Sequence, residues 1–267
     1  MRTNELQHRF FEYLETVPGA TEELVAAQKI QQLLLQDDLP INQGLTVAGV
    51  SIPAYQLSGD YYDFITDDER QRVWVLIGDV MGKGIPAALI MVMLRATVRC
   101  LVSVSDSPGE LLSKLNNLLL KDLTRLKAFS SLFCGYYDEP SSLFYFATAG
   151  HPNPVYYSAK KNSIRKLEAK GTIIGILKDR IYQNHSLPLA KGDLLLLCTD
   201  GVLEAVDKNN LQVSYEMVMD LIMKHKDNSL QHLIEQIIEG INCGTDQFRR
   251  DDVTIAAVRC EEEGGND

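Results

Sequence analysis

The sequence predicts an α+β fold of antiparallel sheets covered by helices. Short apolar or alternating segments with the length of β-strands occur in blocks, and helical patterns occur in pairs between them. Strands and helices do not alternate one by one, so a layered antiparallel fold is favoured over a parallel one. The expected strands are residues 45–56, 60–66, 72–78, 129–138, 143–149, 154–158, 193–199 and 252–260. The expected helices are residues 84–104, 107–122, 214–224 and 229–241.

Residues 1–40 differ from the rest and predict an N-terminal helical extension before a main domain at 41–267. Apolar residues recur at helical spacing on both sides of Pro18-Gly19, and Thr21 is a suitable N-cap, so a helical hairpin or a kinked helix is expected. This apolar stripe either packs on the main domain or pairs with a second copy in a homodimer. It consists of Leu6, Phe10, Leu14, Val17, Leu24, Ala27, Ile30 and Leu34.

The first two strands after residue 56 predict an antiparallel hairpin. Residues 60–66 and 72–78 flank the polar turn Asp67-Asp68-Glu69-Arg70, and the middle of the hairpin falls near the point halfway between Asp60 and Asp79. Directly opposed residues of such a ladder have Cα atoms roughly 4.5–5.5 Å apart. The two carboxylates are therefore expected close enough to share a cation.

Two further aspartates stand at strand ends. Asp200 follows the apolar strand 193–199, and Asp251 precedes the strand 252–260, so antiparallel placement brings both to one sheet edge. Carboxylates that converge at buried strand ends repel one another unless cations neutralise them. The pattern predicts a divalent metal site, and the alternative is that each aspartate caps a turn or a helix.

The composition narrows the classes of partner and location. With 267 residues, 45% of them hydrophobic, the chain has ample material for a core. A formal net charge of -10 argues against nucleic-acid binding, which needs a basic patch. The longest apolar stretch, 85–94, is about half of a bilayer span, and no signal peptide is evident, so we expect a cytoplasmic protein without membrane contact. The cysteines are odd in number and lack C-x-x-C spacing, which indicates buried free thiols in a reducing compartment; they are Cys100, Cys134, Cys198, Cys243 and Cys260.

The loop from Gly78 to Gly84 contains a Gly-Lys pair before a helix, but its spacing does not fit a phosphate-binding P-loop. A tight glycine turn into helix 84–104, with Asp79 facing the metals, fits better. Lys83 either meets an anion there or is solvated.

Five sequence blocks together resemble the SpoIIE/RsbU branch of the PPM-type, metal-dependent protein serine/threonine phosphatases. They occur in the family's order and cover roughly residues 45–260. The blocks are Ser58-Gly59-Asp60-Tyr61-Tyr62-Asp63, Gly78-Asp79-Val80-Met81-Gly82-Lys83-Gly84, Ala149-Gly150-His151-Pro152-Asn153-Pro154, Thr199-Asp200-Gly201-Val202-Leu203-Glu204 and Arg250-Asp251-Asp252-Val253-Thr254.

The resemblance implies a four-layer α-β-β-α sandwich with two Mn²⁺ or Mg²⁺ ions at one edge. Asp79 would bridge both metals and, with Asp200, carry the catalytic role. The Val80 carbonyl would help hold one metal, Asp60 would serve one, and Asp200 and Asp251 the other. Asp63 and Asp252 would support these ligands or substitute for them.

The implied activity is hydrolysis of phosphoserine or phosphothreonine on a bacterial signalling protein. In the family this is commonly a STAS-type anti-sigma-factor antagonist of a partner-switching pathway, and a metal-bridging hydroxide attacks phosphorus without a covalent phosphoenzyme. Two departures from the wider superfamily stand out: no arginine between residues 51 and 60, and Met81 in place of a histidine. His151 aligns loosely with a position where those relatives have an aspartate. His151 is interpreted as a loop histidine hydrogen-bonded between strands.

Two other functions remain as alternatives. A catalytically weak phosphoprotein-binding scaffold would belong to the same pathway. A two-metal nucleotide cyclase or polymerase also uses paired aspartates, but it needs basic residues for a triphosphate, and the Asp79 loop offers only Lys83.

Overall fold

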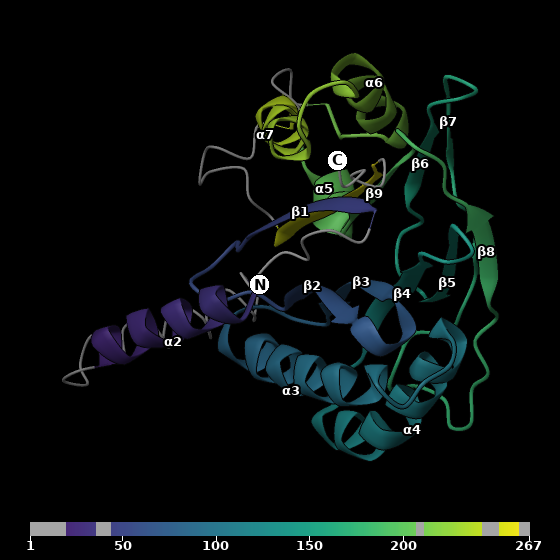
Figure 1. Cartoon of the computed structure of the whole chain (residues 1–267). Helices are drawn as coiled ribbons and strands as arrows, with labels where there is room; N and C mark the ends of the chain where they lie inside the picture. Colours follow the sequence, from purple (N-terminus) through teal and green to yellow (C-terminus); the bar gives the residue numbers. More distant parts are fainter. Residues whose placement is uncertain (1–19, 36–43, 207–210, 242–250, 262–267) are drawn as a thin grey trace.

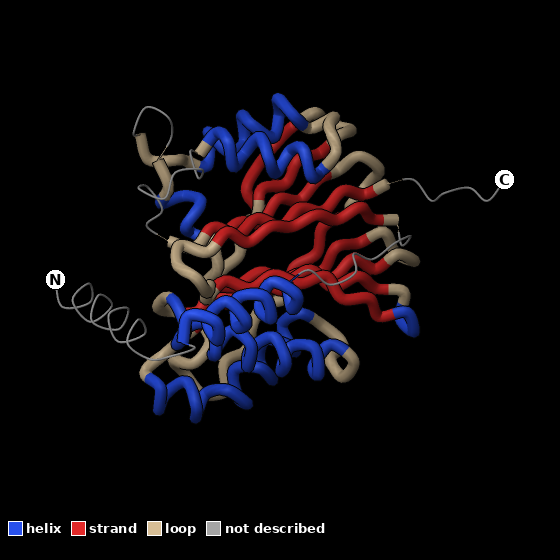
Figure 2. Tube along the Cα trace, turned by 90° about the vertical axis from the view of Figure 1, so that its left-hand side faces the viewer, coloured by secondary structure: helices blue, strands red, loops and turns tan. Residues whose placement is uncertain are grey.

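Two five-stranded sheets are stacked face to face between helices in the computed structural model (Figure 1), which describes residues 20–35, 44–206, 211–241 and 251–261. The turned view shows the two sheets as parallel layers with helices on both outer faces (Figure 2). This arrangement confirms the predicted α+β class and the four-layer α-β-β-α sandwich.

All strand pairs of both sheets are antiparallel. The β1 sheet has the order β1 (Leu45–Ile52), β10 (Val253–Cys260), β9 (Leu194–Cys198), β6 (Val155–Ser158) and β7 (Ser163–Lys166). The β2 sheet has the order β2 (Asp60–Asp67), β3 (Arg72–Val80), β4 (Ser130–Asp138), β5 (Leu143–Ala149) and β8 (His185–Pro188).

Four helices form one pair on each outer face of the sandwich. Helices α3 (Gly84–Val102) and α4 (Pro108–Leu126) cover the β2 sheet, and α6 (Tyr215–His225) and α7 (Leu230–Gly240) cover the β1 sheet (Figures 1 and 2). Serine side chains cap three of these helices by accepting a hydrogen bond from a backbone amide of the first turn, which fixes where each helix begins. The capping residues are Ser107, Ser214 and Ser229.

Three layers of apolar side chains lie between these four layers of backbone. One lies between the β2 sheet and α3 with α4, a second between the two sheets, and a third between the β1 sheet and α6 with α7. The single tryptophan, Trp74, is fully buried in the first of these layers against Tyr136. Burial of this kind holds both sheets in a fixed register, so the strand ends form a defined edge.

Strands β7 and β8 were not expected from the sequence. Both have four residues and lie at the edge of their sheets, and three side chains of β7 and two of β8 are exposed. The hydrophobic pattern is weak in such short edge strands, which explains the omission. Short helical turns at η1 (Asp68–Arg70) and α5 (Asp200–Glu204) were also not foreseen.

Helix α3 is the one helix in the described part of the chain with the length and hydropathy of a membrane span. Half of the apolar window is buried inside the protein, against the β2 sheet.

The N-terminal extension is represented by α2 (Ala20–Leu35). The hairpin or kink expected before residue 20, and the boundary at 40, lie outside the described residues. Gln31 attaches this helix to the domain: its side-chain amide donates to the Ser58 carbonyl and accepts from the Ser58 amide, both at 2.9 Å. Within the predicted stripe Leu24, Ala27 and Leu34 are half-buried, whereas Ile30 is 60% exposed.

Candidate metal centre

The hairpin places Asp60 directly opposite Asp79, as predicted. Asp60 is the first residue of β2, and Asp79 is the penultimate residue of β3, so the β2 sheet contributes two carboxylates at one end. The Val80 amide donates to the Gly59 carbonyl at 3.3 Å and closes this end of the ladder.

The β1 sheet brings the other two aspartates to the same edge. Asp200 begins α5 two residues after β9 ends, and Asp251 lies two residues before β10 begins. Strands β9 and β10 are antiparallel neighbours, which places the end of one beside the start of the other. A Cβ atom at Gly201 would lie 1.9 Å from the Asp252 carbonyl oxygen, so only glycine permits this close approach.

Hydrogen bonds join the two sheets at this edge. The Thr199 hydroxyl, between β9 and α5, donates to Asp60 at 2.9 Å. The Asp252 carboxylate accepts from the amides of Ala54 and Gly59 at 2.7 and 2.8 Å, which holds the connection between β1 and β2. Asp252 therefore supports the site, as the resemblance implied, whereas the role of Thr199 was not foreseen.

The expectation for Asp63 was wrong. Alternate residues of a strand face opposite sides, so Asp60 faces the space between the sheets and Asp63 faces α3. Its carboxylate accepts two hydrogen bonds from Arg99 at 2.8 and 2.7 Å and one from the Tyr61 hydroxyl at 2.8 Å. This ion pair between the buried Asp63 and the half-buried Arg99 fixes α3 on the β2 sheet and contributes no ligand to the edge. The strand period was the sequence signal that would have excluded Asp63.

Burial and neighbouring like charges both disfavour the ionised form of the carboxylates at this edge. Burial, followed by the charges of Asp200, Asp251 and Asp252, raises the pKa of Asp79 from 3.8 to about 8. Burial and the charges of Asp79 and Asp252 raise the pKa of Asp60 well above its ordinary value. The pKa of Asp200 is also raised, first by burial and then by Asp251. Each raised pKa indicates a carboxylate with too little compensating positive charge nearby.

This donor set fits divalent cations. Carboxylate oxygens, which are hard ligands, come from both sheets. Burial and mutual repulsion disfavour their ionised form, and a bound cation would offset both effects. Within the described ranges, no three acidic, histidine or cysteine side chains are already at coordinating distance of one point. Two contacts account for part of this separation, since Asp60 is held by Thr199 and Asp251 pairs with the Lys83 amine at 3.0 Å. Lys83 thus meets a carboxylate of the site itself.

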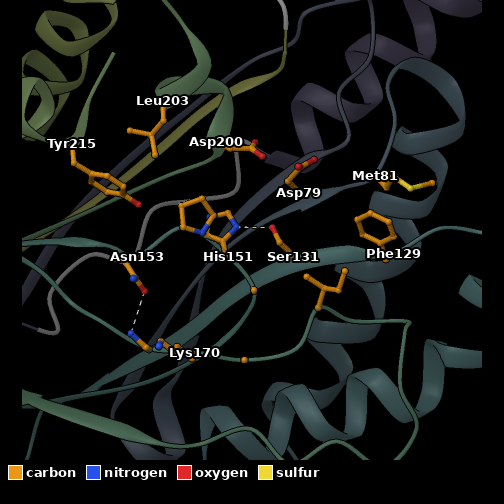
Figure 3. A pocket seen from close by; sticks show the side chains of 15 residues that line it. Asp79, Met81, Phe129, Ser131, His151, Asn153, Lys170, Asp200, Leu203 and Tyr215 are labelled. Atoms are coloured by element: carbon orange, nitrogen blue, oxygen red, sulfur yellow. Dashed lines mark hydrogen bonds between the residues drawn. The ribbon is translucent and has the colours of Figure 1, made fainter. Parts of the chain in front are cut away.

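A cavity of about 590 Å³ opens beside Asp79 and Asp200 (Figure 3). Near its centre lies His151, which is 5% exposed and shares a 2.8 Å hydrogen bond between Nδ1 and the Ser131 hydroxyl. Ser131 is the residue of β4 opposite Asp79. Burial lowers the pKa of His151 to about 3, so its ring is neutral. These contacts agree with the interpretation of His151 as a hydrogen-bonded loop histidine.

The described cysteines offer no nucleophile at this edge. Burial raises the pKa of Cys134, and raises that of Cys198 to about 12, so both remain thiols. Cys260 is likewise buried. Cys100 is exposed on α3, which corrects the expectation that it is buried, and Cys243 lies outside the described residues.

The comparisons with known proteins agree with this geometry. The family model described as "Stage II sporulation protein E (SpoIIE)" matches residues 69–261. The phosphoserine phosphatase RsbU of Bacillus subtilis is 34% identical over 249 residues, which cover 92% of this chain and 73% of RsbU. The phosphoserine phosphatase RsbP of the same organism is 27% identical over 222 residues, which cover 82% of this chain and 53% of RsbP.

Two solved structures share the fold. The SiaA-PP2C domain of Pseudomonas aeruginosa superposes with a TM-score of 0.74 at 21% identity and covers 90% of this chain and 96% of that domain. The structure of the RsbU and RsbW domains of a Mycobacterium tuberculosis protein gives a TM-score of 0.72 at 26% identity, covering 83% of this chain and 61% of that one.

Proposed function

The chain belongs to the SpoIIE family of PP2C-type phosphatases, and on that premise we propose that it hydrolyses phosphoserine or phosphothreonine on a signalling protein. The observation that carries the proposal is the position of Asp79, whose half-buried carboxylate at the end of the β2 sheet is repelled by the charges of Asp200 and Asp251 at the edge of the β1 sheet. A cluster of carboxylates whose pKa values are raised in this way, at the mouth of a cavity, is typical of a catalytic site.

Two divalent cations, Mn²⁺ or Mg²⁺, would be held by carboxylates of both sheets. The proposed ligands are Asp60, Asp79, the Val80 carbonyl, Asp200 and Asp251. When bound, the two cations would supply activation of a water nucleophile and neutralisation of the phosphoryl oxygens, which is the chemistry that direct hydrolysis of a phosphate ester requires.

The remaining contributions come from the chain itself. Thr199 orients the Asp60 carboxylate, and the two amide hydrogen bonds to Asp252 keep the β1–β2 connection against the start of β10. The neutral His151 holds Ser131 beside Asp79. The buried thiols of Cys134, Cys198 and Cys260 offer no nucleophile at the site, which supports hydrolysis without a phosphoenzyme.

We propose a phosphorylated STAS-type antagonist as the substrate and the cytoplasm as the location. The support is contextual: the relatives RsbU and RsbP carry the name phosphoserine phosphatase, and one structural neighbour combines an RsbU domain with an RsbW domain. An acidic chain with no basic run suits a protein substrate better than a nucleic acid.

The test is manganese-dependent hydrolysis of p-nitrophenyl phosphate and of a phosphoserine protein by the wild type and by Asp79→Ala and Asp200→Ala. Both variants should lose at least about 100-fold in turnover, because each removes a ligand that no neighbour replaces. Asp227→Ala, at an exposed position between α6 and α7, is the control and should keep full activity. Turnover of either site variant within a few-fold of wild type would contradict the proposal, and binding of the phosphoprotein without hydrolysis would favour the scaffold.

A further inference from the structure

We propose, on the basis of the phosphatase function proposed above, that Lys170 determines substrate specificity by binding an aspartate or glutamate side chain next to the phosphoserine. Lys170 lies in the segment between β7 and β8, on the wall of the cavity beside the metal ligands.

The cavity has room for more than a phosphoryl group. Its volume of about 590 Å³ falls in the range of sites that enclose whole small ligands, about 300–1,000 Å³. It is lined by Asp79 and Asp200, so a substrate phosphate at those residues would place the neighbouring residues of its chain in the cavity. Apolar side chains form much of the remaining lining, including Phe129, Ile173 and Leu203.

Lys170 is the only lysine or arginine among the described residues that line this cavity. Figure 3 shows it apart from Asp79 and Asp200, on the other side of His151. A cation at that place is better positioned to meet a group beside the phosphate than the phosphate itself.

The backbone that carries Lys170 is held firmly. The Ala169 amide donates to the Asn153 side chain at 3.2 Å, and Ile174 exchanges two backbone hydrogen bonds with Ser130 at 2.9 and 3.2 Å. A Cβ atom at Gly171 would lie 1.8 Å from the Thr148 carbonyl oxygen, so this residue packs directly on β5. Lys170 therefore projects from a fixed wall, which lowers the entropic cost of binding through its side chain.

The charge of Lys170 is available to a ligand. Its side chain is exposed, and none of the carboxylates in the described ranges forms an ion pair with it. Lys83, the other lysine of the site, is already paired with Asp251. A second positive charge lies nearby, since the Lys166 amine stands 4.5 Å from the ring centre of Tyr215, which also lines the cavity.

An acidic partner needs such a local attraction here. The chain carries a formal net charge of -10, and the site itself is formed by carboxylates, so the overall charge of the protein repels acidic segments. The positive charge of Lys170 on the cavity wall offsets this repulsion locally, and it favours substrates with an acidic side chain next to the phosphoserine.

The experiment compares two phosphoserine peptides of equal length, one with aspartates flanking the phosphoserine and one with asparagines. For the wild type the acidic peptide should have the lower KM. Lys170→Gln should raise the KM for the acidic peptide roughly three- to tenfold and leave its kcat unchanged. The KM and kcat for the asparagine peptide and for p-nitrophenyl phosphate should stay as in the wild type. Lys170→Arg should restore the preference, and Lys161→Gln, an exposed lysine in the β6–β7 turn, should have no effect.

The outcomes separate this proposal from the phosphatase function. Equal losses on all three substrates would overturn it, because Lys170 would then bind the phosphoryl group, and an unchanged preference for the acidic peptide would also overturn it. Fluorescence anisotropy of peptides with a non-hydrolysable phosphonate in place of the phosphate gives the same comparison without turnover. Absent manganese-dependent hydrolysis by the wild type would refute the phosphatase function, while the anisotropy would still decide the role of Lys170.

Discussion

Asp79→Asn should stabilise the metal-free protein while it abolishes catalysis. The pKa of Asp79 rises from 3.8 to about 8 in the folded state, and each pKa unit corresponds to about 1.4 kcal/mol. An isolated carboxylate with this pKa would destabilise the fold by on the order of 5 kcal/mol above pH 8. Asp79 titrates together with Asp200 and Asp251, so part of this cost is relieved when a neighbour binds a proton instead. We therefore expect the neutral asparagine to raise the free energy of unfolding by about 2–4 kcal/mol.

The sign of the pH dependence follows from the raised pKa. The folded state holds the Asp79 proton more tightly than the unfolded state, so its stabilising effect is complete below pH 3.8 and is lost as the pH rises to about 8. Asparagine cannot ionise. The advantage of the variant over the wild type should therefore grow from about pH 5 to about pH 8.5.

Urea unfolding in EDTA, followed by the fluorescence of the single buried Trp74, measures this difference. Manganese should raise the midpoint of the wild type and leave that of the variant nearly unchanged, because the ligand set is incomplete. Asp227→Asn is the matched control on the surface. A variant that is no more stable than the wild type at about pH 8.5 would refute the claim that the edge carboxylates repel one another.

Three further predictions concern other parts of the molecule. Arg99→Met should destabilise the fold by about 1.5–3 kcal/mol in urea unfolding, since it removes two charge-assisted hydrogen bonds from the buried Asp63 and leaves it Arg95 at 3.9 Å and the Tyr61 hydroxyl; a loss below about 0.5 kcal/mol would contradict the ion pair. Cys198→Ser should lower the melting temperature but keep kcat, and loss of turnover on thiol alkylation of the folded enzyme would refute a mechanism without a nucleophilic thiol. Ile30→Glu with Leu34→Glu should shift the mass in light scattering towards the monomer, if α2 forms the proposed homodimer contact; unchanged mass and activity would exclude that role.

Local chain geometry explains why part of the site was predictable. The opposition of Asp60 and Asp79 follows from a hairpin that is symmetric about its turn, and the placement of Asp200 follows from the end of an apolar strand. The hydrogen bond from Thr199 to Asp60 joins residues that are 139 positions apart, so it depends on how two sheets stack. No local pattern in the sequence encodes that distance.

The same distinction explains the errors. The side of the strand on which Asp63 lies is fixed by the two-residue period, yet the resemblance groups it with Asp60 in one motif. Cys100 lies in an apolar run, but the helix turns it to the solvent. The short edge strands β7 and β8 have too few buried positions to produce a pattern.

Because the aspartates are divided between two sheets, the distances between their carboxylates depend on the relative position of the sheets. Asp60 and Asp79 move with one sheet, and Asp200 and Asp251 move with the other. Any partner or substitution that slides the sheets past each other would change the distances between the carboxylates even without touching them. Under the proposed ligand assignment, cation affinity would depend on how the two sheets pack, and substitutions in the core far from the edge would change it.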